Sequence, residues 1–491
     1  MFTKNTPHIL CIFFIFSLIF GVNAFQRAHT IMPDPAEISL ISSSIAISEI
    51  IGSSSGFSGF YEVLGELRKE HNLSNSINCE SLEAGKCIVR NINFDTAIVV
   101  AAASSNQPFL YLEREDLGEI TFHKLAYVIF GVSTLALNLL FFLILSISIF
   151  LFITAFGWSK QRLIAIIALL LSMLITVTIM PNFDASVAAV QSRRFLPVLA
   201  IIPTAHICYS LCDRLLPSLK QILILTTQII LLCFVIHVRS SCAYFLGIIA
   251  IMFMFTFAQN LRLKSKHFWA NTPHKMVFAI LVCVKAMFFI YVFTWSSPIY
   301  DDKKLGHLFW HPIHIGLAAH PDANKKYGIY PESDMPSFEY IAAVSERQHG
   351  SREWEKYLDY QDFDNALRDR FLHIAKTDPI FVLQSYAYKL PQYFDMLTQE
   401  VLLPNLGLMF LLVIFSVLTG IYLWPVEEKR NDKAYRTHIL MCLFSFLPPL
   451  ALLPSFAYSI EFTIQLIGLK FLILTNFGGV LRSRFLSRSN Q

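Results

Sequence analysis

Four acidic residues border long apolar segments, where a carboxylate could serve as a general base. They are Asp34, Glu37, Glu115 and Asp116. Such a base would remove the proton from a hydroxyl acceptor. Asp34 and Glu37 also fit a helix capping box around Pro35, and Glu115 and Asp116 also fit a solvated helix entry. The catalytic and the structural interpretation therefore both stay open for each pair.

Three basic residues occupy positions where charge is costly or unexpected. Arg193 and Arg194 lie at one end of an apolar segment, and Lys285 lies in the middle of another. Adjacent guanidinium groups can chelate phosphate oxygens, and a lysine at the centre of a spanning helix usually faces a cavity. These residues could therefore hold the phosphate of a lipid-linked substrate. The alternatives are headgroup anchors for the arginines and a snorkelling or neutral lysine.

Three histidines, His307, His311 and His314, follow one another at intervals of four and three residues. On one face of a helix this spacing could bind zinc. Pro312 argues against a regular helix there, and no clear carboxylate partner accompanies the histidines. We therefore expect hydrogen bonding or substrate contact from these histidines, with a divalent metal as the weaker alternative. The sequence implies no cofactor.

Composition identifies the class of protein that carries these residues. Of the 491 residues, 55% are hydrophobic and only 15% are charged, and the mean hydropathy is +0.53. Soluble domains carry about 25% charged residues, so the composition excludes a disordered chain and argues against a soluble enzyme. The formal net charge of +4 is too small for a nucleic-acid-binding protein. The composition predicts an all-α, multi-pass membrane protein.

Ten apolar segments are long enough to cross a bilayer, since a spanning helix needs about 20 residues. The predicted spans are 8–24, 126–157, 162–180, 195–213, 221–238, 242–259, 276–296, 404–425, 438–455 and 459–477. The first could instead be a cleavable signal peptide. Pro197 and Pro203 interrupt the fourth, which membrane helices tolerate.

The short loops fix the expected orientation. Their Lys and Arg residues lie predominantly on one side, which predicts that this side is cytoplasmic in a plasma (inner) membrane. If the first helix is retained, both termini are cytoplasmic as well. The chain then divides into a first helix or signal peptide, an extracytoplasmic loop, a bundle, an extracytoplasmic helical segment and a C-terminal group with a basic tail. The five parts are 1–24, 25–125, 126–296, 297–403 and 404–491.

The two long segments carry local signals of their own. A surface helix is expected over 38–51, and two helices over 365–376 and 379–390, separated at Asp378-Pro379. The acidic run 359–364 should supply helix caps. Cys79 and Cys87 share the oxidising side, where a disulfide between them is expected. The alternative is two free thiols.

This layout resembles the GT-C superfamily of polytopic membrane glycosyltransferases. The resembling features are a first helix, a long outer loop with an acidic residue and a surface helix, a helical bundle, and a second outer segment before the last spans. The run 364–390 with Asp378-Pro379 is similar to the segment before the late spans in bacterial members. Asp34 or Glu37 is nearest to the family's acidic position, whereas the Asp-Glu pair of several branches is absent.

The resemblance implies an activity at the outer face of the membrane. A sugar would move from a polyprenyl-phosphate donor to a glycan, lipid or protein acceptor. An outer acid would act as the base, and Arg193, Arg194 and Lys285 would hold the donor phosphate. A transporter or flippase and a non-catalytic subunit of envelope polysaccharide export are the alternatives.

Overall fold

The computed structural model describes a helical protein. The described residues are 118–131, 134–156, 196–212, 219–262, 309–330 and 334–396, together with isolated helical positions at 46, 280, 281, 284, 285, 288, 413, 414, 416–418, 470 and 473. Helices make up all the regular structure in this part of the chain, and no strand occurs in it. This agrees with the predicted all-α class.

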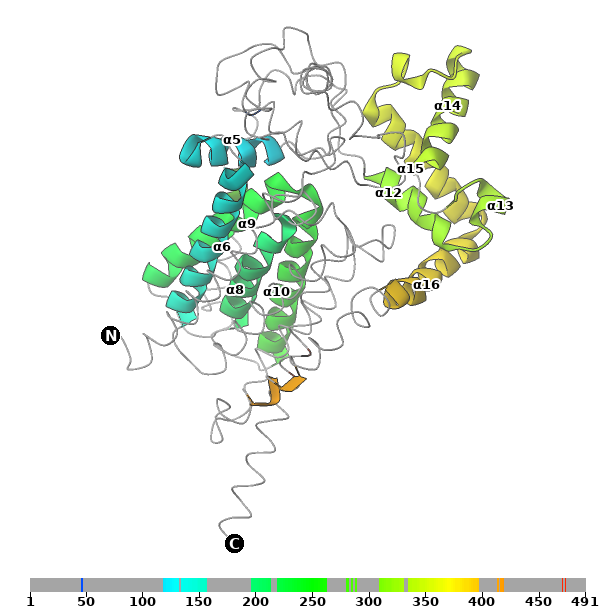
Figure 1. Ribbon diagram of the computed structural model, residues 1–491. Helices are drawn as coiled ribbons and strands as arrows, with labels where there is room; N and C mark the ends of the chain where they lie inside the picture. Colours follow the sequence, from blue (N-terminus) through cyan, green and yellow to red (C-terminus); the bar gives the residue numbers. More distant parts are fainter. Residues whose placement is uncertain are drawn as a thin grey trace.

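One group of helices forms an apolar bundle whose longer members run side by side (Figure 1). Its members are α5 (Gly118–Phe130), α6 (Thr134–Phe156), η5 (Leu196–Ala200), α8 (Ile201–Cys212), α9 (Leu219–Val238), η6 (Ser240–Ala243) and α10 (Tyr244–Arg262). Helix α5 lies across one end of this bundle. Helix α6 runs in a different direction from α5 and packs along α9.

Two helices of the described part are long and apolar enough to cross a membrane. They contain Ala136–Ala155 in α6 and Leu219–Val238 in α9, and shorter apolar helices occur at Leu196–Leu211 and Tyr244–Met254. These four segments fall within or beside the predicted spans 126–157, 195–213, 221–238 and 242–259. Their composition is compatible with membrane association, and the ten-span layout stays a prediction.

The predicted span 126–157 is not one helix. Helix α5 ends at Phe130, and α6 begins at Thr134. Between them Gly131 has a φ of 83°, in the left-handed region that favours glycine, and its N–H donates to the Tyr127 carbonyl at 3.0 Å. The glycine thus ends α5 and allows the chain to change direction before it enters the long apolar helix.

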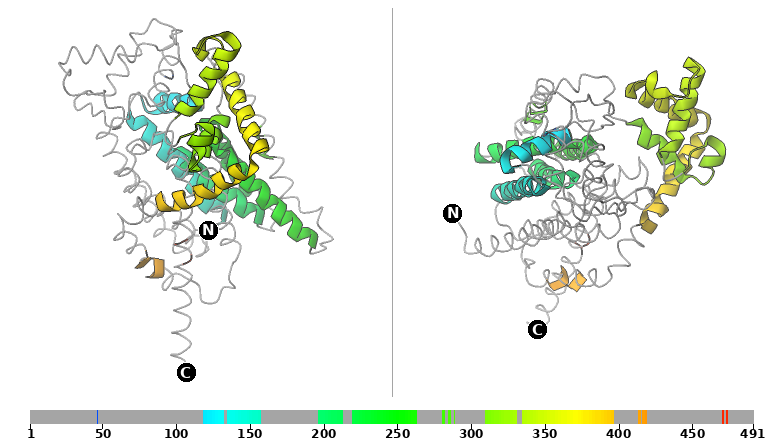
Figure 2. Two further views of the ribbon diagram at one scale, coloured as in Figure 1. Left: turned by 90° about the vertical axis from the view of Figure 1, so that its right-hand side faces the viewer. Right: turned by 45° about the horizontal axis from the view of Figure 1, so that its top comes forward.

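A second group of helices, which we call the helical lobe, comprises residues 309–330 and 334–396. Its elements are α12 (Trp310–Ile315), η9 (Gly316–Ala319), α13 (Ala323–Tyr327), α14 (Met335–His349), η10 (Trp354–Lys356), α15 (Tyr360–Thr377) and α16 (Pro379–Met396). Figure 2 shows that α14 and α16 lie at opposite ends of this lobe. Its helices pack chiefly on one another.

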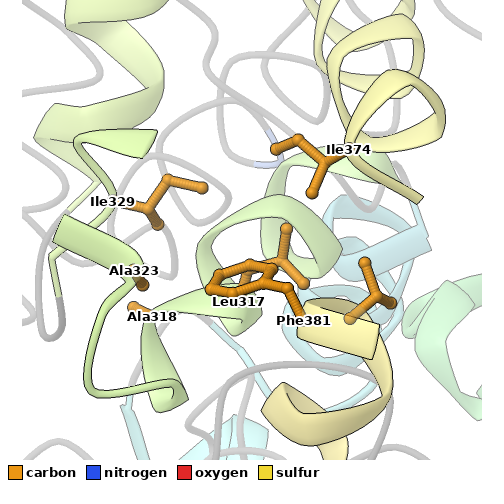
Figure 3. Packing of buried hydrophobic residues seen from close by; sticks show 7 residues of the cluster. Leu317, Ala318, Ala323, Ile329, Ile374 and Phe381 are labelled. Carbon is orange, nitrogen blue, oxygen red and sulfur yellow. The ribbon is translucent and has the colours of Figure 1, made fainter. Parts of the chain in front are cut away.

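Two apolar clusters hold the lobe together. The first joins η9, α13, α15 and the start of α16, with Leu317, Ile374 and Phe381 at its centre (Figure 3). The second joins α14, η10 and α15 through Ile341, Trp354 and Phe363. Because α15 contributes to both clusters, it is the central helix of the lobe.

Acidic side chains accept hydrogen bonds from the first turns of three helices of the lobe. Asp359 and Asp362 form a reciprocal capping box at the start of α15, as the acidic run predicted. Asp378 separates α15 from α16 and accepts from the Phe381 N–H at 3.1 Å. Asp364 reaches across from α15 and accepts from the Trp310 N–H at 2.7 Å, which caps α12.

The expectation that Pro312 prevents a regular helix is wrong. Pro312 lies in the first turn of α12, where the missing N–H removes no hydrogen bond within the helix. Helix α16 also contains a proline, Pro391, which lies inside the helix, and the helix continues beyond it to Met396.

Candidate functional sites

Most of the residues singled out in the sequence lie outside the described residues. This holds for Asp34, Glu37, Cys79, Cys87, Glu115, Asp116, Arg193, Arg194 and His307. Their proposed roles stay predictions. Lys285, His311 and His314 lie inside the described part, and Glu119 and His123 emerge as further candidates.

A buried acid–base pair lies at the start of α5. Glu119 and His123 are both 0% exposed, and Glu119 Oε1 lies 3.9 Å from His123 Nε2 across one helical turn. Glu119 is in the first turn of α5, where the helix dipole favours a negative charge. A fully buried carboxylate beside a buried imidazole is uncommon, so this position is a candidate for chemistry.

The pair is positioned by close packing of α5 on the end of α9. A Cβ atom at Gly118 would overlap with the carbonyl group of His237, so only glycine permits this approach. Thr121 Oγ1 lies 3.4 Å from His237 Nε2, and Arg239, just beyond α9, is buried. The corner between α5 and α9 therefore gathers an acid, two histidines and an arginine within one end of the apolar bundle.

Lys285 is half-buried and lies on the side of Cys233 of α9. The lysine thus lies near α9, as expected for a charged residue that avoids lipid by facing other helices. Its predicted contact with a donor phosphate stays a prediction.

A buried polar network crosses the bundle from α6 to α9 and α8. Ser148 Oγ donates to Gln228 Oε1 at 2.8 Å, and Gln228 Nε2 donates to the Ser148 carbonyl at 2.6 Å. Gln228 Nε2 also lies 3.2 Å from His206 Nδ1, and all three side chains are buried. In apolar helices such hydrogen bonds fix which faces meet.

The two described histidines of the predicted triplet each bond to a residue at the start of α14. His311 Nε2 lies 3.1 Å from Asp334 Oδ1, and His314 Nδ1 lies 3.0 Å from Ser337 Oγ. They are three residues apart on α12, so both reach the same partner helix. Each of the two histidines makes a hydrogen bond within the lobe, and the role predicted for them at a site, including contact with a substrate, stays a prediction.

Burial sets the ionisation of this cluster. It lowers the pKa of His314 to about 3, helped by the nearby positive charge of Arg370 and by His311. The hydrogen bond from His311 lowers the pKa of Asp334. Arg370 stacks on the Tyr340 ring with its guanidinium carbon 4.1 Å from the ring centre. At neutral pH the site therefore holds a neutral His314 beside a fixed cation.

A metal centre does not emerge in the described part of the chain. No group of three or more His, Cys, Asp or Glu residues lies close enough there to bind an ion. His311 and His314 instead have Asp334 and Ser337 as partners.

One further buried cation lies on α16. Lys389 is 1% exposed, with its ammonium 4.5 Å from the centre of the Tyr386 ring. Desolvation lowers the pKa of Lys389 to about 7. The lysine therefore points into the lobe rather than toward its surroundings.

Sequence reasoning missed Glu119, His123, Asp334, Arg370 and Lys389. Glu119 ends the acidic run that begins at Glu113, which looks solvated, and its burial depends on packing against α9. The available signal was the spacing of four between Glu119 and His123. Comparison with protein-family models, with curated proteins and with solved structures gives no match to this chain.

Proposed function

We propose that the protein is a GT-C-like glycosyltransferase, which moves a sugar from a polyprenyl-phosphate donor to a glycan, lipid or protein acceptor at the outer face of the membrane. The layout of apolar and long polar segments supports this proposal. The structural observation that carries it is the buried Glu119–His123 pair at the end of an apolar bundle. Glycosyl transfer needs a positioned base, and Glu119 is a carboxylate held beside an imidazole.

Each group has a defined task in this reaction. Glu119 accepts the proton of the acceptor hydroxyl as the acceptor oxygen bonds to the anomeric carbon. The bond from that carbon to the phosphate oxygen breaks, and polyprenyl phosphate leaves. Arg193 and Arg194 neutralise the phosphate. A single displacement of this kind inverts the anomeric carbon, because no covalent intermediate forms.

Burial of Glu119 adds a requirement for access. Because the carboxylate is 0% exposed, an acceptor reaches it only when the segments covering it open. Asp34, Glu37, Glu115 and Asp116 remain the competing candidates for the base.

The test replaces Glu119 by glutamine in the full chain reconstituted in liposomes. The donors are polyprenyl-phosphate hexoses and pentoses labelled in the sugar, and the measurement is label transferred to added glycan, lipid or peptide acceptors. Glu119→Gln should lower transfer about 100-fold or more, because general-base catalysis contributes at least that factor. Glu346→Gln is the matched control, since this exposed glutamate on α14 pairs with Arg352 far from α5 in sequence.

Two outcomes would contradict the proposal at different levels. Full transfer by a correctly folded Glu119→Gln protein would exclude this residue as the base. Intact donors after incubation of the wild-type chain with every acceptor class would exclude the transferase itself.

A transporter or flippase is the second candidate, and the buried network of Ser148, Gln228 and His206 favours it. Polar side chains inside apolar helices often mark a pathway through the membrane. The same liposomes distinguish the two activities, because a flippase moves the labelled lipid between leaflets with its sugar–phosphate bond intact.

A further inference from the structure

From Ile380 to Pro391, helix α16 presents an uncharged stripe to its surroundings. Ile380 is 65% exposed and Leu383 is 70% exposed. With the other members of the stripe they recur at the spacing of one helical face. The stripe, which keeps this name below, consists of Ile380, Leu383, Gln384, Ala387, Tyr388 and Pro391, all exposed.

The charged group that precedes the last turn of α16 is turned away from the stripe, and the stripe's amide is already bonded. Lys389 is the only charged residue in 379–394, and it is 1% exposed. Exposed Asp395 follows beyond the stripe, in the last turn of the helix. Gln384 is the one amide of the stripe, and its Oε1 lies 3.2 Å from His320 Nε2. The Asp322 N–H donates to His320 Nδ1, so Nε2 carries the proton that Gln384 accepts. This arrangement reverses that of a solvent-facing helix, in which a lysine extends into water.

Helix α15 shows the opposite pattern within the same lobe. Its Leu372 is 48% exposed, but the surrounding exposed residues on that helix are polar and charged. They are Asp369, His373 and Lys376, and half-exposed Arg368 lies beside them. An isolated leucine among charges is ordinary protein surface, whereas an uncharged stripe along a helix marks a binding surface.

We propose that the stripe of α16 lies in the interfacial layer of the lipid bilayer. The chain leaving α16 supports lipid as the occupant, because only residues 397–403 separate the helix from the predicted span 404–425. Seven extended residues reach about 25 Å at most, so the end of α16 is held close to the membrane. Figure 1 shows α16 at the end of the lobe opposite α14, where contact with a surface does not require burial of α14.

An amphipathic helix binds an interface with its apolar face about 5–10 Å into the headgroup and acyl boundary. Tyrosine is enriched at that depth, which suits Tyr388. The lobe would then lie on the membrane with α16 as its contact helix. This inference is independent of the transferase proposal, since it concerns where the lobe sits and not what it catalyses.

The test places a fluorescent amino acid in the full chain, at Leu383 in one protein and at Leu372 in the other. Both side chains are exposed leucines of the lobe, so neither label disturbs a core. The proteins are reconstituted in phosphatidylcholine vesicles brominated near the carbonyl end of the acyl chains, with unbrominated vesicles as reference. The label at residue 383 should lose about half its emission, because its helix face lies at that depth. The label at residue 372 should instead be quenched by aqueous iodide.

A second label at Ile380 should behave as the one at Leu383. Quenching of both stripe labels by iodide, as for residue 372, would show that the stripe faces water and would overturn the proposal. Protection of both from iodide and from bromine would show that protein covers the stripe, and would equally overturn it.

Discussion

His314 is held as a neutral imidazole inside the lobe. Its ring is fully buried, and Arg370, His311 and Asp334 are the charged or titratable groups that bear on the pair of histidines. Protonation would place a second cation near Arg370 without water to stabilise it. The neutral form is thus part of the folded structure rather than a consequence of the ambient pH.

This burial predicts a loss of lobe stability in acid. The pKa of His314 is about 3 in the folded protein and 6.5 when exposed. Between these values the unfolded chain binds the extra proton, so the free energy of unfolding falls as pH falls from about 6.5 toward 3. The slope is at most about 1.4 kcal/mol per pH unit. Hydrogen exchange of the α12 and α14 amides should therefore quicken as pH falls, after correction for intrinsic rates.

His314→Gln should remove this pH dependence, because an amide can still bond to Ser337 but does not titrate. His349→Gln is the matched control, since His349 is exposed at the end of α14 and stacks on Tyr357. An unchanged slope in His314→Gln would assign the acid sensitivity to another group. The Asp334 carboxyl contributes to the pH dependence of stability only at lower pH, because its folded pKa lies below the ordinary value of 3.8.

At the scale of elements, the apolar bundle depends on one glutamine that bonds to two other helices. Gln228 of α9 contacts Ser148 of α6 and His206 of α8. Hydrogen bonds between apolar helices measured in membrane proteins are worth up to about 1.7 kcal/mol each. We therefore expect Gln228→Leu to lower the melting temperature of the purified protein by destabilising the bundle by about 1–2 kcal/mol.

The comparison variant is Gln221→Leu, because Gln221 lies on the same helix and is exposed. It should melt close to the wild type. Equal melting temperatures for the two variants would mean that the network contributes nothing to helix packing. Such a result would strengthen the transport interpretation, in which the polar groups serve a substrate.

Sequence patterns predicted helix positions well where long apolar runs or capping residues mark them. The prediction for 221–238 corresponds to α9, and Asp378-Pro379 separates α15 from α16 as expected. The helix break at Gly131 could not be predicted from the sequence, because a glycine inside an apolar run ends a helix only when packing selects a positive φ. The burial of Glu119 was equally hidden, since it depends on the approach of α5 to α9 at Gly118.

At the scale of the whole molecule, the predicted orientation places the helical lobe outside and the loop 260–275 in the cytoplasm. An impermeant maleimide applied to intact cells should therefore label Gln348→Cys, because Gln348 is exposed on the lobe. Asn271→Cys should react only after the membrane is permeabilised. Cys208, Cys233 and Cys242 are buried, so these three add little background. The remaining native cysteines are replaced by serine.

The reverse labelling pattern would invert the topology and move the lobe to the cytoplasmic side. In that case the polyprenyl-phosphate donor would have to be used at the inner face. The contact of α16 with lipid would survive the inversion, because it depends only on the distance from the lobe to the next span.

The end of α14 is a suitable place to attach a rigid domain for electron microscopy. Gly350 ends this helix with a φ of 74°, its N–H donates to the Glu346 carbonyl at 2.9 Å, and no atom lies within 4 Å of the place where a Cβ would stand. A rigid fiducial domain inserted there would lie on the side of the lobe away from α16. Particles of a 56.0 kDa chain embedded in a detergent micelle could then be aligned by electron microscopy on a feature outside the micelle.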